Sequence, residues 1–162
     1  MKQLKLFPVQ KFCMDADVLI NLKHYPKDIF APMWDKIENM IKKGEIISHI
    51  EVFEEIKTGG DEIYEWCKKR HIKKMFKDVD DCQITEINKV EEKYNREVWE
   101  RNASKPHWAD PWLIALAICE GAIIVTNEAN RRWRIPFIAN YFNIKTLSLF
   151  DFFRKVGIKW EK

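Results

Sequence analysis

The sequence is poor in several features that mark particular protein classes. Among its 162 residues it has only 5 Gly and 4 Cys, and it has no apolar run of transmembrane length. Its N-terminal stretch is too polar for a signal peptide. The cysteines lack the short spacing of a zinc site and the pattern of a disulfide framework; they are Cys13, Cys67, Cys82 and Cys119. We therefore expect a cytoplasmic chain with reduced cysteines and no membrane partner.

The chain also lacks a strong excess of either charge. It has 28 Lys and Arg against 25 Asp and Glu, a formal net charge of +3. Such a balance does not by itself indicate a polyanionic partner, so any contact with nucleic acid must depend on local basic patches. The length suits one domain with a sizeable core, and no repeat or linker divides the chain. We therefore predict a single domain over residues 1–162.

Short apolar runs and helical patterns alternate along the chain. Four runs are predicted to be strands, at residues 11–15, 45–49, 122–127 and 144–149. This alternation is typical of an α/β fold with a parallel sheet covered on both faces. We predict a three-layer α/β/α architecture with a central, mainly parallel sheet. Two charged amphipathic helices, roughly residues 61–103, are predicted to form an all-helical insert between strands.

Acidic residues recur where the predicted strands end. In an open parallel sheet, binding sites lie outside the carboxyl ends of the strands. Asp15 ends the first run, a glutamate-bearing helix follows the second, Asp110 begins an apolar helix, and Glu128 follows the run at 122–127. Clustered carboxylates repel unless they share a cation, and a set of oxygen ligands alone indicates Mg²⁺ or Mn²⁺. Such an ion activates water for attack on phosphorus, so the pattern predicts metal-dependent phosphate chemistry.

The helix after the second strand carries three glutamates, and its periodicity helps to choose among them. At about 100° per residue, its apolar side chains define one buried stripe. Glu55 lies on the border of this stripe, whereas Glu51 and Glu54 lie farther round and are expected to face water. We predict that Glu55 is the metal ligand, with Glu54 as the alternative.

The other acids also have purely structural interpretations. Asp110 precedes Pro111, so it is well suited to cap the helix that follows, although a capping carboxylate can also bind a metal. Asp17 is expected to cap its own helix. Glu128 could be a solvated loop acid. The histidines have no spacing that indicates a nucleophile partner or a ligand set; they are His24, His49, His71 and His107.

Four motifs in this order resemble the PIN-domain nuclease superfamily: "DADVLI", "HIEVFEEI", "ADPWLIALA" and "IIVTNE". The resemblance is greatest to a PIN-like, VapC-like family of bacterial and archaeal proteins, and it spans nearly the whole chain. It implies a Mg²⁺- or Mn²⁺-dependent ribonuclease. It also implies a role as the toxin of a toxin–antitoxin pair, with an antitoxin protein as partner, or as an RNA-processing nuclease. Many PIN proteins are homodimers, and the 7 Trp and 10 Phe offer material for an interface.

The resemblance also assigns the site residues. Asp15, Glu55, Asp110 and Glu128 fall on the catalytic, metal-binding acids of the family. Glu128 departs from the pattern, because many PIN domains have Asp there, and its longer side chain puts the geometry of a second metal position in doubt. The supporting positions are Thr126, which would orient an acid or contact phosphate, Asp17 and Asn127.

Two segments near these acids combine basic and aromatic residues. Arginine binds phosphate oxygens and tryptophan offers a stacking surface, a combination suited to single-stranded RNA. The alternative is a solvated basic loop with packed tryptophans. The predicted RNA-binding residues are Arg131, Arg132, Trp133 and Arg134 in "ANRRWRIP", and Lys105 and Trp108 in "KPHW".

Two other functions compete with the nuclease. The opening motif also resembles haloacid dehalogenase phosphatases, in which Asp15 would be the nucleophile and Asp17 the acid/base. That family needs a late lysine and a Gly-Asp-x-x-x-Asp strand end, and the sequence has neither. The second alternative is a catalytically inactive PIN-fold module that binds RNA or protein. Against it, all four acidic positions are occupied.

Overall fold

The computed structural model describes residues 9–159, which fold around a five-stranded sheet. All neighbouring strands are parallel, and the order across the sheet is β3-β2-β1-β4-β5. The central strand is β1, in which Cys13 pairs with Ile47 of β2 on one side and Ile124 of β4 on the other. The strands are β1 (Phe12–Met14), β2 (Ile46–His49), β3 (Phe76–Lys77), β4 (Ile123–Val125) and β5 (Thr146–Leu147).

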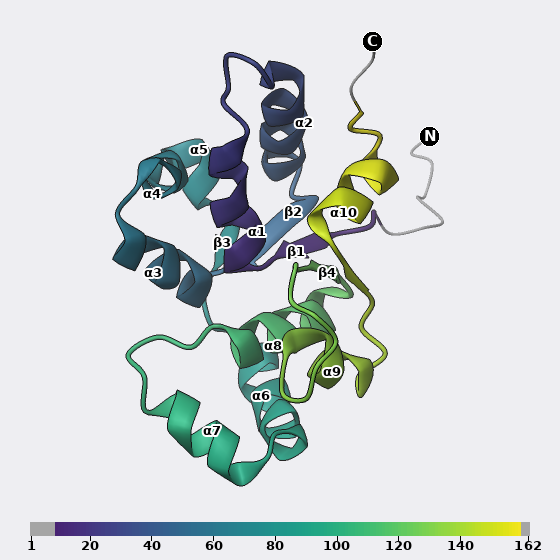
Figure 1. Ribbon diagram of the computed structural model, residues 1–162. Coiled ribbons are helices and arrows are strands. Elements are labelled where there is room, and N and C mark those ends of the chain that lie inside the picture. The colour runs from purple at the N-terminus through teal and green to yellow at the C-terminus, as the bar shows by residue number, and fades with distance from the viewer. Residues whose placement is uncertain (1–8, 160–162) are drawn as a thin grey trace.

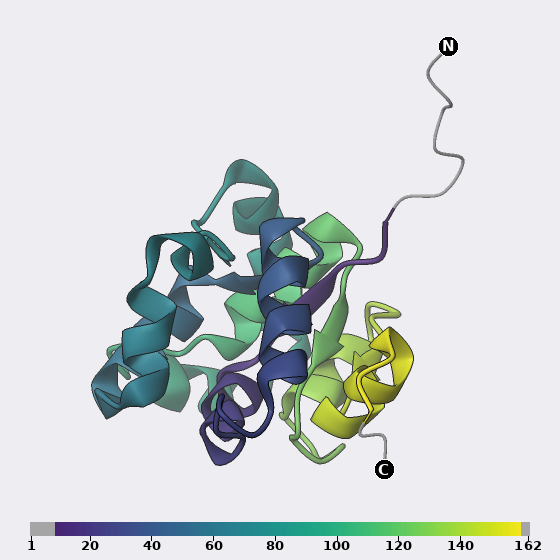
Figure 2. The same cartoon turned by 90° about the horizontal axis from the view of Figure 1, so that it is seen from above.

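Helices cover both faces of this sheet and make three layers (Figure 1). One face carries α1, α2 and α10, and the other carries α6, α8 and α9. Seen from above, α2 lies across the sheet between α10 and the group α3 to α5 (Figure 2). The predicted α/β fold with a parallel central sheet is confirmed. The helices are α1 (Ala16–Asn21), the 3₁₀ helix η1 (Leu22–His24), α2 (Ala31–Lys42), α3 (Ile50–Gly59), α4 (Glu62–Lys68), α5 (Arg70–Lys73), α6 (Asp81–Lys93), α7 (Arg96–Ala103), α8 (Asp110–Glu120), α9 (Ile135–Asn140) and α10 (Leu149–Val156).

The core lies on both sides of the short strands. Every residue of β1 and β4 is buried, which explains why these strands appear in the sequence as unbroken apolar runs. On the α10 side, Phe12 meets Phe152 edge to face with 5.0 Å between ring centroids. Burial of each such large apolar side chain contributes about 1.5–3 kcal/mol, so the sheet is a rigid base for residues at its edge.

The turn from α8 into β4 brings two separate acids to the same edge of the sheet. Helix α8 ends at Gly121, whose φ of 62° lies in the left-handed region that glycine adopts without strain. The backbone N–H of Ala122 then donates to the carbonyl oxygen of Ala117 over 3.0 Å. The chain can therefore leave α8 and enter β4 at once, and the start of α8 and the end of β4 lie at the same edge.

The prediction that residues 61–103 form an all-helical insert is wrong, because the segment includes one strand. The segment contains α4, α5, α6 and α7, but it also contains β3, which extends the sheet beyond β2. Ser48 of β2 is in register with Phe76 of β3. The two residues of β3 comprise one buried and one exposed side chain, too short a pattern to indicate a strand. The four strands expected from the apolar runs are confirmed, and the single-domain organisation stays a prediction.

The prediction that all four cysteines are reduced is wrong for two of them. Cys82 of α6 forms a disulfide with Cys119 of α8, with 6.1 Å between the Cα atoms. Cys13 and Cys67 are free and buried. The pair is separated by 37 positions, so no short sequence pattern relates them. The bond links two helices on the same face of the sheet.

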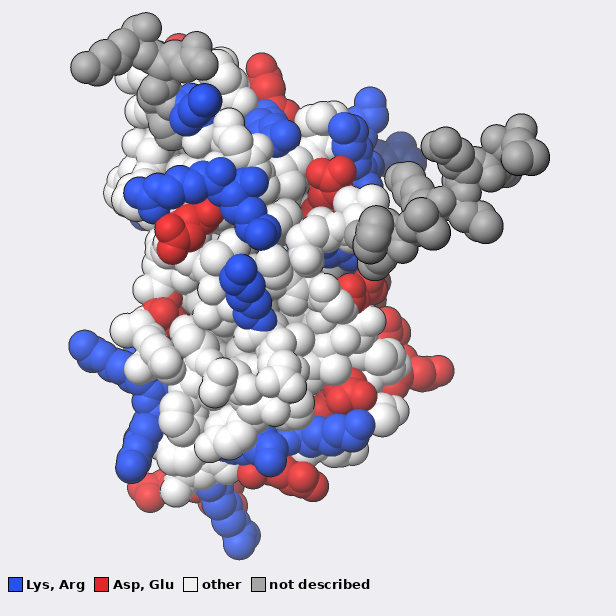
Figure 3. All heavy atoms as spheres, turned by 90° about the vertical axis from the view of Figure 1, so that its right-hand side faces the viewer, with Lys and Arg blue, Asp and Glu red and all other residues white. Residues whose placement is uncertain are grey.

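Positive and negative side chains are mixed on one face of the molecule. On the face seen in Figure 3, Lys and Arg side chains alternate with Asp and Glu side chains rather than forming one patch of a single sign. Within residues 9–159, no helix combines the length and the apolar character needed to span a membrane.

Candidate active site

Asp15 lies at the centre of the acidic edge and is held by two hydrogen bonds. Its Oδ1 accepts from the backbone N–H of Ala16 (2.7 Å), which caps α1, and its Oδ2 accepts from the Thr126 hydroxyl (2.8 Å). The residue is only 4% exposed. Burial, followed by the neighbouring charges of Asp17 and Asp110, raises the pKa of Asp15 well above its usual range. The side chain is therefore fixed in position, but its ionised form is disfavoured by burial and by the neighbouring acids.

The residues that follow β4 form hydrogen bonds with Asp15 and Asp17. The buried Thr126 hydroxyl donates to Asp15 and accepts from the backbone N–H of Glu128 (3.1 Å). The backbone N–H of Asn127 donates to Asp17 Oδ2 (3.0 Å). Thr126 and Asn127 therefore contact the acids through hydrogen bonds, and their supporting role in an active site stays a prediction.

The prediction that Asp17 caps its own helix is wrong. Asp15 occupies the cap position, and Asp17 is the second residue of α1, where its carboxylate reaches across to Asn127. Asp17 Oδ1 is buried and has no hydrogen-bond partner within the described part of the chain. Burial raises the pKa of Asp17. A buried carboxylate oxygen without a hydrogen-bond partner destabilises a folded protein, because its lost hydration is not replaced. A bound cation at this position would supply the missing partner.

Asp110 is also not the cap of its helix. The cap residue is Ala109, and Asp110 is the first residue of α8, with Pro111 in the first turn. Glu55 Oε1 accepts from the backbone N–H of Ala109 (2.9 Å), so a carboxylate from α3 takes part at this helix start. Burial, then the charges of Glu128 and Glu55, raise the pKa of Asp110 to about 7, against the opposing charge of Arg134.

Glu128 has a structural partner on each oxygen. Its Oε2 accepts from the backbone N–H of Ile135 (2.9 Å), the first residue of α9, and its Oε1 lies 3.8 Å from the Arg134 guanidinium. The side chain is 19% exposed, so it is not a freely solvated loop acid. Its charge still raises the pKa of Asp15, Asp110 and Glu55, in each case after the effect of burial.

The structure thus brings the four predicted acids to the same edge, while their role as metal ligands stays a prediction. Among residues 9–159, no three or more His, Cys, Asp or Glu side chains are grouped closely enough to hold a metal ion. In Asp15, Glu55 and Glu128, one carboxylate oxygen instead accepts a hydrogen bond from a backbone N–H. The oxygen-only donor set, its burial and the unpartnered Asp17 Oδ1 fit a hard divalent cation, which would replace these interactions in part.

The predicted RNA-binding residues fall into two groups. The tryptophan rings pack against other aromatic rings of the protein. The Trp108 ring centroid lies 5.1 Å from those of both Tyr94 and Trp99, and the Trp133 centroid lies 5.5 Å from that of Phe137. The cations are exposed, but two of them have partners. Lys105 Nζ donates to Asn102 Oδ1 (2.8 Å), and Arg134 faces Glu128. Within the described part of the chain, the side chains of the two remaining exposed cations, Arg131 and Arg132, form no hydrogen bond or ion pair.

Two histidines near this edge have partners that the sequence did not indicate. His49 caps α3, with Nδ1 accepting from the backbone N–H of Glu51 (3.0 Å), and Nε2 lies 2.7 Å from Gln83 Oε1. Burial lowers the pKa of His49, which favours the neutral form of its ring. Glu51, expected to face water, is half-buried against His107, with 3.2 Å between Oε2 and Nδ1. Only the position of His49 directly before a helix could have indicated the first contact.

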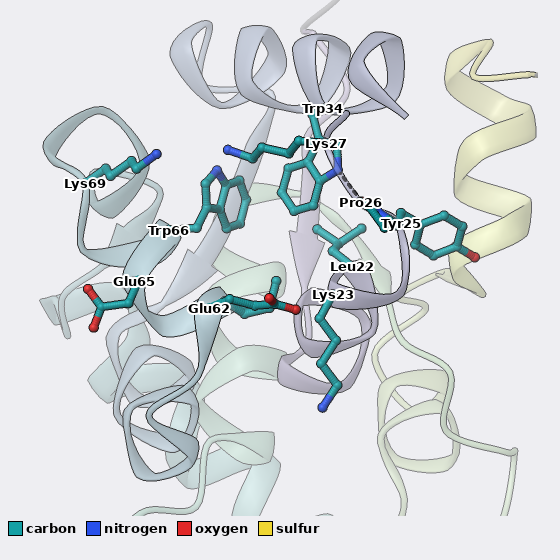
Figure 4. A pocket seen from close by; sticks show the side chains of 11 residues that line it. Leu22, Lys23, Tyr25, Pro26, Lys27, Trp34, Glu62, Glu65, Trp66 and Lys69 are labelled. Atoms are coloured by element: carbon teal, nitrogen blue, oxygen red, sulfur yellow. Dashed lines mark hydrogen bonds between the residues drawn. The ribbon is translucent and has the colours of Figure 1, made fainter. Parts of the chain in front are cut away.

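A separate pocket of about 490 Å³ lies between η1, the start of α2 and α4 (Figure 4). Its walls include the Trp34 and Trp66 rings, which meet edge to face at 5.1 Å. The Trp34 indole N–H donates to the carbonyl oxygen of Tyr25 (2.6 Å). None of the predicted site acids lines this pocket, so it is distinct from the acidic edge.

Comparison with known families places this architecture. A family described as a domain of unknown function, DUF4411, matches residues 12–160. The chain belongs to the DUF4411 family. Its fold resembles a chain of the crystal structure of VapBC2 from Rickettsia felis bound to a DNA fragment from their promoter, with a TM-score of 0.51 and 14% identity over 86% of this chain and 98% of that chain. No curated protein matches. This DUF4411 protein thus has a PIN-like fold.

Proposed function

We propose that this DUF4411 protein is a ribonuclease that uses Mg²⁺ or Mn²⁺ to hydrolyse phosphodiester bonds in RNA. The observation that carries the proposal is the acidic edge itself. Asp15, Glu55, Asp110 and Glu128 come from four separate segments, and burial together with mutual repulsion raises the pKa of the first three. Such a cluster does not stabilise the fold, because burial and mutual repulsion raise these pKa values in spite of the hydrogen bonds that the acids accept.

Each acid contributes a different degree of preorganisation. Asp15 is fixed by Ala16 and Thr126, and Asp110 is fixed in the first turn of α8. Glu55 and Glu128 have longer side chains and are proposed to hold the ion partly through water. The bound cation would polarise a phosphoryl oxygen and lower the pKa of a water molecule. Because both oxygens of Asp15 accept hydrogen bonds, this side chain suits a fixed ligand better than the nucleophile of a phosphatase.

Single-stranded RNA is the proposed substrate. Arg131 and Arg132 are exposed in the loop between Glu128 and α9, and we propose that their guanidinium groups bind phosphates of the RNA. Arg134 is held next to Glu128 and offers a further positive charge at the acids themselves. Removing these arginines should weaken RNA binding more than it changes the catalytic step.

The biological role proposed is that of a toxin paired with an antitoxin protein. The structural relative is, by its own description, the VapBC2 complex bound to promoter DNA. An adjacent reading frame for a small protein that co-purifies with this chain would support the pairing, and a lone gene would weaken it. We also propose a homodimer. A mass equal to one chain by light scattering, at the concentrations used for activity, would contradict that part.

The nuclease proposal is tested by incubating the purified protein with single-stranded RNA and Mn²⁺ or Mg²⁺, with and without a chelator. We expect cleavage that depends on the metal and stops when the chelator is added. Cleavage that resists the chelator would contradict the metal site. An absence of cleavage with any divalent metal would favour the alternative of an inactive PIN-fold module, which would still bind RNA or a protein partner.

The choice between two neighbouring glutamates gives a matched test of the site. Glu55→Gln is expected to slow RNA cleavage by roughly 100-fold, because Glu55 faces Ala109 and Asp110 at the acidic edge. Glu54→Gln, one position earlier on the same helix, should leave the rate nearly unchanged. Rates are compared under saturating Mn²⁺. The reverse pattern, with Glu54→Gln inactive and Glu55→Gln active, would show that the ligand on α3 has been assigned to the wrong residue.

A further inference from the structure

His107 and Glu51 form a pair at the border of the acidic edge. His107 Nδ1 lies 3.2 Å from Glu51 Oε2, and the two side chains are 36% and 29% exposed. The imidazole is therefore oriented by a carboxylate and is also open to a molecule arriving from solvent. The pair joins two segments that are 56 positions apart in sequence.

The segment that carries His107 runs along the same face of α3 as the predicted metal ligand. Glu51 and Glu55 are one helical turn apart, so their side chains lie on one face. His107 contacts Glu51, and the backbone N–H of Ala109 contacts Glu55. Asp110 follows directly. His107 is thus held beside two of the acids, and in its protonated form it would oppose the effect of burial, which raises the pKa of Glu55.

The acids account for only one half of a hydrolysis reaction. A cation held by carboxylates assists the attack of water on phosphorus, but the oxygen that leaves phosphorus also needs a proton. The other cations at this edge are poor donors of one. Arg134 carries a guanidinium, which does not release its proton, and Lys105 Nζ is bound to Asn102. An imidazolium exchanges its proton readily near neutral pH.

We propose that His107 is the general acid of the reaction and that Glu51 is its positioning residue. Water adds to phosphorus and gives up a proton to solvent, the bond from phosphorus to the leaving oxygen breaks, and its electron pair stays on that oxygen. The leaving oxygen takes the proton from His107 Nε2, while Nδ1–H donates to Glu51. The products are a phosphomonoester and an alcohol, and His107 regains a proton from solvent. This assignment rests on the proposed nuclease function.

The test compares two substrates that differ in their need for a proton. One is a short single-stranded RNA, whose leaving alkoxide needs protonation, and the other is a p-nitrophenyl phosphodiester of a nucleoside, whose leaving group departs as an anion. His107→Gln should slow RNA cleavage by roughly 100-fold or more. The same variant should cleave the nitrophenyl ester at nearly the rate of the unaltered protein. Glu51→Gln should show the same selectivity with a smaller loss.

Matched controls separate this role from a structural one. His71 also faces a glutamate, with 4.0 Å between Nε2 and Glu38 Oε2, but it lies on α5, and His71→Gln should leave both rates unchanged. Thermal unfolding and Mn²⁺ binding of His107→Gln should match the unaltered protein. Equal losses on both substrates, or no loss on RNA, would overturn the general-acid assignment while leaving the nuclease intact. Failure of the unaltered protein to cleave either substrate would overturn both.

Discussion

Replacing Asp15 with asparagine is expected to abolish RNA cleavage, by about 1,000-fold or more, while making the metal-free protein more stable. Asparagine keeps the shape of the side chain and can still accept from Ala16 and bond to Thr126. It removes the charge that burial and the carboxylates of Asp17 and Asp110 oppose. Cleavage rates with Mn²⁺ and melting temperatures in chelator-containing buffer at pH 8 measure both effects.

An exposed aspartate provides the control for this substitution. Asp28 lies on the surface between η1 and α2, and Asp28→Asn should change neither the cleavage rate nor the melting temperature. The two effects of Asp15→Asn are expected together, because both follow from the same crowded charge. If the substitution lowered stability as well as activity, Asp15 would be a structural residue whose charge the fold requires.

The second large effect is a dependence of stability on pH and metal that centres on Asp110. Its pKa rises from 3.8 to about 7 on folding, so the folded protein holds this proton more tightly than the unfolded chain. The stabilising contribution of the protonated form is complete below pH 3.8 and is lost as pH rises through 7. The melting temperature of the metal-free protein should therefore fall across this range.

Asp110→Asn removes this titration and isolates its contribution. Below pH 3.8 the variant and the unaltered protein should melt at similar temperatures, whereas at pH 8 in chelator the variant should melt higher by roughly 5 °C. Mn²⁺ at pH 8 should raise the melting temperature of the unaltered protein and not that of the variant, because a ligand stabilises only the state that binds it. A flat pH profile for the unaltered metal-free protein would contradict the account of Asp110.

The parts of the fold that depend on local patterns could be predicted from the sequence. The runs around Phe12, Ile47 and Ile124 are buried on both faces of a parallel sheet, so each is apolar throughout and easy to recognise. The rule that sites lie at the carboxyl ends of parallel strands then predicted that Asp15 and Glu128 would approach each other. Both conclusions use only short-range information and one topological rule.

Features that depend on contacts between distant segments could not be predicted. The Cys82–Cys119 disulfide and the His107–Glu51 pair join positions that only the packing of α6 on α8, and of the loop before α8 on α3, brings together. Strand β3 is too short to show a pattern. The cap of α8 also depends on tertiary structure, because Glu55 reaches the N–H of Ala109 and leaves Asp110 inside the helix.

If the acids of this edge share a divalent cation, direct titration with Mn²⁺ detects the binding without any substrate. The protein is stripped of metal and titrated calorimetrically at pH 8, alongside Asp15→Asn and Asp28→Asn. We expect saturable binding to the unaltered protein and to Asp28→Asn, and none to Asp15→Asn over the same concentrations. Binding that survives in Asp15→Asn, or no binding to the unaltered protein, would contradict the account.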